Sequence, residues 1–115
     1  MSRGYVYVLT NESMPGMVKI GKTTRSVDQR ASELWQTGVP TPFVADYWQY
    51  MPDCDTAECA LHERFSAERV SESREFFRVP ARRVFFEIEE ILDFQLDSLV
   101  SEFSRDHSVI DKRDS

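Results

Sequence analysis

Acidic, imidazole and phenol side chains occur at spacings that place them on shared faces of predicted elements. Glu58 and His62 lie four residues apart in a predicted helix, so their side chains share one helix face. Tyr5 and Tyr7 alternate along a predicted strand and point to the same side of it. Such groups can transfer protons or orient water. Each also has a structural interpretation, because strand tyrosines often pack half-buried and Glu58 can close a capping box with Asp55.

Cysteine and histidine also occur close together, at Cys54, Cys59 and His62. Only Cys59 and His62 have an i, i+3 spacing, and no second Cys/His pair follows nearby, as a structural zinc site requires. We therefore expect no zinc site. The two cysteines lie five residues apart in one predicted helix and point away from each other, so we also expect free thiols in a reducing compartment.

Arginine recurs six times between residues 64 and 83, interleaved with phenylalanine. The positions are Arg64, Arg69, Arg74, Arg78, Arg82 and Arg83. Such a run can follow a nucleic acid backbone, because lysine and arginine neutralise phosphates and aromatic rings stack on bases. Four glutamates lie in this segment or directly before it, at positions 63, 68, 72 and 75, so ordinary ion pairing is an equally good interpretation.

Strands account for three segments of the chain. Residues 4–10 and 18–23 alternate and are rich in β-branched and aromatic residues, with turn formers between them, which predicts a hairpin. Residues 43–51 are dense in aromatics and predict a third strand. Residues 75–79 are either a short fourth strand or merely extended.

Three helices are predicted between and after these strands. Ser26 is an N-cap for a helix that ends near residues 37–38, with Val27, Ala31, Leu34 and Trp35 on one face. A second helix covers residues 53–70, with Ala57, Ala60, Leu61 and Phe65 toward the core. Pro80 begins a third helix of about 25 residues, or ~37 Å at 1.5 Å per residue.

The apolar stripe of the third helix is the strongest helical pattern in the chain. It is Phe85, Ile88, Leu92, Leu96, Leu99 and Phe103. Further apolar residues widen it beyond what a lone surface helix needs, so it is either one wide core-facing helix or partly a contact with a second copy. The prediction is an α+β domain with a small, mainly antiparallel three-stranded sheet. Its core is residues 1–80, followed by a C-terminal amphipathic helix at 81–104 and a polar tail at 105–115.

Charge is unevenly distributed along the 115 residues, whose net charge is −6. Residues 1–83 hold equal numbers of acidic and basic side chains, so the excess negative charge lies in the C-terminal third. A neutral body can present a basic cleft to nucleic acid despite the overall sign. No apolar run approaches the ~20 residues that span a bilayer, and residues 1–10 lack a signal-peptide core. We therefore expect a cytoplasmic protein with no membrane contact.

Five sequence blocks occur in a characteristic order: YVYVLTN, VKIGKT, TGVPTPF, ALHERF and EFFRV. In this order they resemble the GIY-YIG nuclease superfamily, closest to a short phage and bacterial branch with an Orf172-type DNA-binding or nuclease domain. The resemblance covers about residues 4–79. It implies a metal-dependent DNA endonuclease, encoded by a phage, a prophage or a bacterium.

The resemblance assigns roles to individual residues. Tyr7 would activate or orient the attacking water, Arg30 would bind the scissile phosphate, and Glu58 would bind Mg²⁺ or Mn²⁺. A lone glutamate suffices for such an ion, because Mg²⁺ usually keeps several waters. His62 would act as a nearby hydrogen-bond donor or a proton shuttle, and Tyr5 is a secondary catalytic candidate.

Such a site also needs positive charge near the catalytic tyrosine. A free tyrosine has a pKa of about 10, so a phenolate at neutral pH needs nearby cations. Lys19, Lys22 and Arg30 are the candidates, with Lys19 also counted among the catalytic residues. For contact with nucleic acid we expect Lys22, Arg25, Arg64 and Arg69.

The chain departs from the superfamily pattern at three places. Tyr5 stands where the family name has glycine, and Lys19 stands where it has the second tyrosine. An ammonium supplies charge where a phenol can shuttle a proton, although the resemblance includes active members with lysine there. The asparagine that many members carry after the metal-binding helix is missing, and Glu75 occupies that region without an assigned role.

Two other functions compete with a DNA endonuclease. The first is a DNA-binding module that keeps the fold with little or no cleavage. The second is an interaction protein in which the long acidic helix binds a partner or forms a homodimer.

Overall fold

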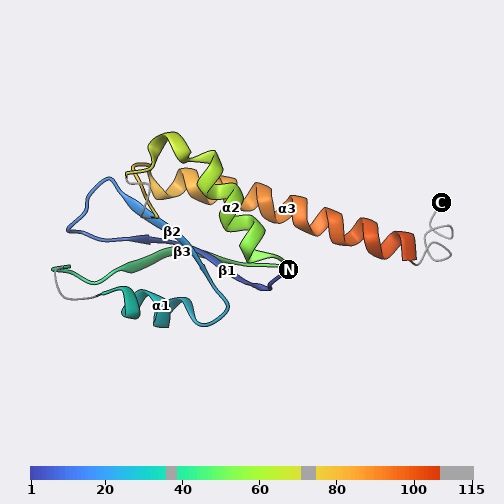
Figure 1. The fold of residues 1–115 in the computed structure, drawn as a ribbon, viewed down its shortest axis with the longest axis horizontal. Helices are drawn as coiled ribbons and strands as arrows, with labels where there is room; N and C mark the ends of the chain where they lie inside the picture. Colours follow the sequence, from blue (N-terminus) through green and yellow to red (C-terminus); the bar gives the residue numbers. More distant parts are fainter. Residues whose placement is uncertain (36–38, 71–74, 107–115) are drawn as a thin grey trace.

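Four strands and three α-helices form the domain. The computed structural model describes residues 1–35, 39–70 and 75–106 (Figure 1). The strands are β1 (Gly4–Thr10), β2 (Val18–Thr23), β3 (Val44–Met51) and β4 (Phe76–Phe77). They pair antiparallel in the order β3-β1-β2-β4. The α+β class with an antiparallel sheet is confirmed, and residues 76–77 form the fourth strand that the sequence left open.

The two faces of the sheet carry different partners. Val6, Val8, Val18 and Ile20 pack beneath α2 (Cys54–Arg64) and α3 (Ala81–Asp106). The opposite face carries Tyr7 and Leu9 and is covered by α1 (Val27–Leu34). Figure 1 shows α1 on one side of the sheet and the other two helices on the other.

Helix α1 begins as its sequence predicts. The Ser26 side chain accepts a hydrogen bond from the backbone N–H of Gln29, which satisfies one of the free donors of the first turn. Val27 and Ala31 are buried against the sheet. The helix ends at Leu34, earlier than predicted, and Trp35 is exposed beyond it. The predicted end near 37–38 lies outside the described residues.

Helix α2 is shorter than predicted and is capped by a different residue. Asp53, with extended backbone, accepts from the N–H of Thr56, whereas Asp55 lies inside the helix. The capping box of Asp55 with Glu58 is therefore wrong. The helix ends at Arg64 instead of continuing to residue 70, because the chain turns at the buried Phe65 into a short 3₁₀ helix, Ser66–Glu68.

Helix α3 is long, as predicted, but only its first half belongs to the core. Val84, Ile88 and Ile91 are buried beneath the sheet and α2. Farther along, Phe94 and Val100 are 72% and 62% exposed, and the helix continues past the end of the sheet (Figure 1). The core-facing interpretation therefore holds for the first half alone. Among the described residues, no helix is both long and apolar enough to cross a membrane.

Candidate functional site

Tyr7 lies at the centre of the candidate site, in the middle of the sheet. It faces Gly21 of the neighbouring strand in the β1–β2 register. Its ring lies directly over that glycine, where a side-chain carbon would come within 2.4 Å of the Tyr7 hydroxyl oxygen. The side chain is only 1% exposed, because α1 covers it from the other side. Strand register, the missing Cβ and the helix therefore hold the phenol in one place.

Arg30 of α1 reaches the Tyr7 hydroxyl and hydrogen-bonds to it. A guanidinium has donors and no acceptor, so Arg30 donates and the Tyr7 hydroxyl oxygen accepts. This arrangement leaves the Tyr7 O–H free to donate to a further group. The phenol and the guanidinium can thus offer two donors to one anionic oxygen.

Burial decides the protonation state of Tyr7. Desolvation raises the pKa of its phenol above 10.0, and the charges of Glu75 and Glu58 act in the same direction. The hydrogen bond and the charge of Arg30 lower it, by less. Tyr7 is therefore a neutral phenol at pH 7. The raised pKa contradicts the expectation from the sequence of a phenolate stabilised by nearby cations. It can donate a hydrogen bond and orient water.

Glu58 of α2, its neighbour His62 and Glu75 form a cluster next to β2. One ligand atom from each residue lies within 4.8 Å of those of the other two. Desolvation raises the pKa of Glu58 above its usual 4.5, and the charge of Glu75 adds to this effect. Two carboxylates and an imidazole at this separation match the donors of a divalent-cation site.

His62 is held in a fixed orientation. Its Nε2 lies 2.9 Å from the carbonyl oxygen of Ile20, and its ring packs on Phe77 at 5.1 Å between centroids. A carbonyl can only accept, so Nε2 carries a hydrogen and is the donor, and Nδ1 is the ring nitrogen left to interact with another group. A backbone carbonyl bound to one ring nitrogen is the arrangement that orients a metal-ligating or proton-accepting histidine.

Lys19 is committed to Glu75. The side chain of Lys19 is almost fully buried, and its Nζ lies 2.9 Å from Glu75 Oε2 and 5.6 Å from the centre of the Phe76 ring. Lys19 is therefore placed to neutralise the second carboxylate of the cluster. From the sequence alone, Glu75 occupies the region of the missing asparagine and has no assigned role.

The four cations expected to contact nucleic acid lie in two regions. Arg25 donates both terminal nitrogens to Glu33 beside the site, and Lys22 pairs with Asp55 at the start of α2. Arg64 pairs with Glu87 and Glu90 of α3, and Arg69 lies over the Phe77 ring. Ion pairing along α3 is thus the interpretation that Arg64 supports.

Three further residues singled out in the sequence lie outside the cluster. The exposed Cys59 is not part of the metal-capable cluster found among the described residues, and Cys54 is buried as a free thiol. Tyr5 lies on the face of Tyr7 but packs edge-on against Tyr50, with ring centres 5.3 Å apart. Tyr5 therefore contacts a ring of β3, and it is not one of the cluster residues.

Comparison with known families decides the membership of the chain. The family model of the T5orf172 domain matches residues 4–94. The chain belongs to the T5orf172 domain family. This domain is associated with DNA-binding and nuclease-like proteins of GIY-YIG-like or phage type. No curated protein and no solved structure matches the chain.

The T5orf172 match includes every residue of the candidate site and ends near the point where α3 leaves the core. Leu92 is the last residue of α3 that packs against the main core cluster, two residues before the end of the match. The exposed second half of α3 lies beyond the matched domain. The site residues and the apolar core cluster around them therefore belong to the T5orf172 unit.

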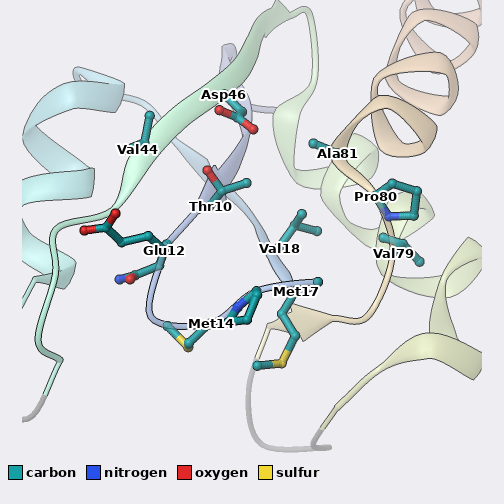
Figure 2. Close-up of a pocket in the computed structure, with 13 residues that line it drawn as sticks. Thr10, Glu12, Met14, Met17, Val18, Val44, Asp46, Val79, Pro80 and Ala81 are labelled. Carbon is teal, nitrogen blue, oxygen red and sulfur yellow. The ribbon is translucent and has the colours of Figure 1, made fainter.

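A cleft of about 500 Å³ lies elsewhere in the T5orf172 domain (Figure 2). It is formed by the β1–β2 turn, the start of β3 and the start of α3, with Thr10, Met17, Val44 and Pro80 in its wall. Glu12 and Asp46 are its charged side chains, and both would repel phosphate. None of the candidate site residues lines it, so the cleft is not the site.

Proposed function

We propose that this T5orf172 domain is a divalent-metal-dependent DNA endonuclease that hydrolyses phosphodiester bonds by a GIY-YIG-type mechanism. The observation that supports this most is the convergence of two groups beside β2. One is the Tyr7–Arg30 pair, and the other is the cluster of Glu58, His62 and Glu75. The charges of both glutamates act on the Tyr7 phenol, so the two groups belong to one electrostatic environment.

Arg30 is the phosphate-binding group in this proposal. Its side chain is partly exposed, and its Nη1 lies at a long 3.4 Å from Glu33, so most of its donors are available. A guanidinium matches the geometry of two phosphate oxygens better than an ammonium does. Arg30 would hold the scissile phosphate next to the Tyr7 hydroxyl.

Tyr7 and His62 would manage the attacking water. The Tyr7 O–H, left free by the hydrogen bond from Arg30, can donate to a water or to a phosphate oxygen. His62 Nδ1, left free because Nε2 binds Ile20, can accept a proton from that water. These are positioning and proton-transfer roles that a neutral phenol and an imidazole can perform.

The donor set of the cluster fits Mg²⁺ or Mn²⁺. Glu58 would be the main ligand and Glu75 a second one, because hard cations prefer carboxylate oxygens and water. The raised pKa of Glu58 supports this fit, because two clustered carboxylates are most stable with a proton or a cation between them. Such an ion supplies positive charge to the phosphate and to the leaving oxygen.

Nicking of supercoiled plasmid at low salt tests the proposal. We expect wild-type protein to nick with Mg²⁺ or Mn²⁺ and to stop when EDTA is added. Replacing Arg30 by alanine should lower the rate by about 10²–10³-fold, the usual effect of removing one charge-stabilising group. Gln29→Ala, on the same helix and exposed, is the matched control and should nick like wild type. Equal rates for Arg30→Ala and wild type would contradict the proposal.

Metal affinity should also depend on pH in a defined direction. The pKa of Glu58 is raised, so this carboxyl takes up a proton at a higher pH than an ordinary glutamate does. A divalent ion binds only the deprotonated form, so affinity should fall as pH decreases through the Glu58 pKa, by about tenfold per unit below it. Titration of Mn²⁺ by electron paramagnetic resonance between pH 5 and pH 8 measures this. A flat profile would show that Glu58 is not a ligand.

A DNA-binding module without cleavage is the second candidate, and one observation favours it. Lys19 stands where the superfamily name has its second tyrosine and pairs with Glu75 at 2.9 Å, so an ammonium already neutralises one carboxylate of the cluster. In that case the protein binds plasmid in a salt-sensitive way and never nicks it. Lys19→Tyr then becomes informative, because a gain of nicking would show a site that has lost one group.

A further inference from the structure

Three aromatic side chains form an exposed strip on β3 and the adjacent end of β1. Trp48 is 50% exposed and Tyr50 is 49% exposed, and Tyr5 packs edge-on against Tyr50. We call Tyr5, Trp48 and Tyr50 the aromatic strip. β3 is an outer strand of the sheet, bonded only to β1 among the described strands. Exposed apolar side chains that lie next to one another, unlike scattered single ones, mark an interaction site.

The aromatic strip shares the sheet face of the candidate site. In the β1–β3 register Trp48 is directly opposite Tyr7, and Tyr50 is directly opposite Tyr5. Paired residues of antiparallel strands point to the same side, so the Trp48 indole stands next to the Tyr7 position on the face that carries α1. Helix α1 covers Tyr7 and Leu9 and leaves half of Trp48 and Tyr50 open.

Two arginines lie in α1 or just before it, and α1 is the helix that packs on this face. Arg25 binds Glu33 through two hydrogen bonds of 3.0 and 3.2 Å, and Arg30 approaches the same carboxylate at 3.4 Å. Two guanidiniums around one carboxylate carry a net positive charge on the side of the sheet that α1 covers, which is also the side of the strip. Cations that follow a backbone, next to aromatic rings that stack on bases, are the two components of sites for single-stranded nucleic acid.

We propose that the aromatic strip binds unpaired bases and that the substrate of the site is single-stranded DNA or a single-stranded segment of a duplex. Trp48 and Tyr50 would each stack on one base, while Arg25 and Arg30 bind the phosphates that lead to Tyr7. This inference rests on the proposed function, of which it names the substrate class.

Ring spacing is the reason for preferring a single strand. The Cα atoms of alternate strand residues lie about 6.6–6.8 Å apart, so the two rings of Trp48 and Tyr50 start from backbone positions separated by roughly that distance. Neighbouring bases of a duplex are stacked at about 3.4 Å per strand. Two consecutive bases can therefore stack on these two rings only when they are separated from each other. A single strand allows this at little cost, whereas a duplex must first be opened.

Binding in EDTA tests the inference separately from cleavage. Fluorescence anisotropy compares a labelled 20-nucleotide single strand with the duplex of the same sequence. We expect tighter binding of the single strand, and we expect Trp48→Ala and Tyr50→Ala each to weaken it by about 5- to 150-fold, equivalent to about 1–3 kcal/mol per stacked base. Trp48→Phe, which keeps a ring, should bind nearly as wild type does. Duplex affinity should stay the same in all three variants.

The other tryptophan provides the control and a second readout. Trp35 is 52% exposed at the end of α1 and lies outside the strip. Trp35→Phe should bind like wild type and leaves Trp48 as the single tryptophan, whose fluorescence the single strand should then quench. Unquenched Trp48, or equal affinities of Trp48→Ala and wild-type protein for the single strand, would overturn the inference.

The same experiment separates the two proposals. Strip-dependent binding of single strands without any nicking supports the inference and refutes the endonuclease. Nicking that is lost in Arg30→Ala but unchanged in Trp48→Ala and Tyr50→Ala, on single strands and duplexes alike, supports the endonuclease and refutes the strip. A change in oligomeric state caused by Trp48→Ala, with DNA binding intact, would show that the strip contacts a second copy.

Discussion

Replacing Glu58 by glutamine should abolish nicking and at the same time make the protein more stable. Burial and the charge of Glu75 raise the pKa of this carboxyl, which means that folding disfavours its ionised form. Between the ordinary value of 4.5 and the raised value the folded state binds more protons than the unfolded state does. Stability is therefore lost as pH rises through this interval, and it remains lower at pH 7. Glutamine has nearly the same shape and carries no charge.

Thermal unfolding and plasmid nicking measure the two effects together. We expect the melting temperature of Glu58→Gln to exceed that of wild type at pH 7, with the difference shrinking at pH 4, where both proteins are neutral at this position. Nicking should fall by at least about 100-fold, as when a main charge-stabilising group is removed. Glu63→Gln, an exposed position of the same helix, is the matched control and should change neither quantity. A lower melting temperature for Glu58→Gln would show a structural role for this carboxylate.

Glu58 is available to the cluster because it does not take part in capping α2. Had Asp55 been the cap, Glu58 would sit at the third helical position and return a hydrogen bond to the helix start. Asp53 is the cap instead, and its side chain accepts from Thr56. Two acidic residues, two positions apart before a helix, cannot be distinguished by sequence pattern. The backbone at residue 53 decides between them, because it is extended there.

Local sequence predicted the parts of the fold that neighbouring residues determine. The alternation in β1 and β2 places Tyr7 on one face, and the serine before Val27 caps α1, because both effects act within a few residues. The C-terminal end of α2 is not predicted by local sequence. α2 turns at Phe65 because that ring is buried in the core, and a helical pattern that continues past it carries no sign of this turn.

The parts of the site that the sequence does not predict depend on contacts between residues far apart in the chain. Glu75 approaches Lys19 across 56 positions of the chain, through a two-residue strand that pairs with the start of β2. No spacing rule predicts such a contact. The second half of α3 is a similar case, because its apolar stripe continues while the sheet beneath it ends. Whether a stripe is covered depends on the length of its partner.

Gly21 must lack a side chain because the Tyr7 ring lies over it, a contact that the sequence does not reveal. We expect its replacement by alanine to lower both stability and activity. An alanine Cβ at this position would lie 2.4 Å from the Tyr7 hydroxyl oxygen and 2.5 Å from the adjacent ring carbon. Real contacts of this kind are not observed, so either the phenol or the β2 backbone must move. We expect Gly21→Ala to lower the free energy of unfolding by about 1–3 kcal/mol, the usual cost of overpacking a core. It should also displace Tyr7 from Arg30 and reduce nicking.

A double-mutant cycle measures that contact directly. In a Tyr7→Ala background the clashing ring is gone, so Gly21→Ala should cost much less stability than it does in wild type, and the difference is the coupling energy. Gly16→Ala is the matched control. Gly16 has a φ of +78° and nothing within 4 Å of its missing Cβ, so alanine strains the turn there by about 1 kcal/mol without touching the site. Gly16→Ala should lose stability and still nick at the wild-type rate. If Gly21→Ala lowers the free energy of unfolding equally with Tyr7 and with Ala at position 7, the phenol does not lie over Gly21. Gly21 would then be required by the β2 strand itself, and the position of Tyr7 would need another explanation.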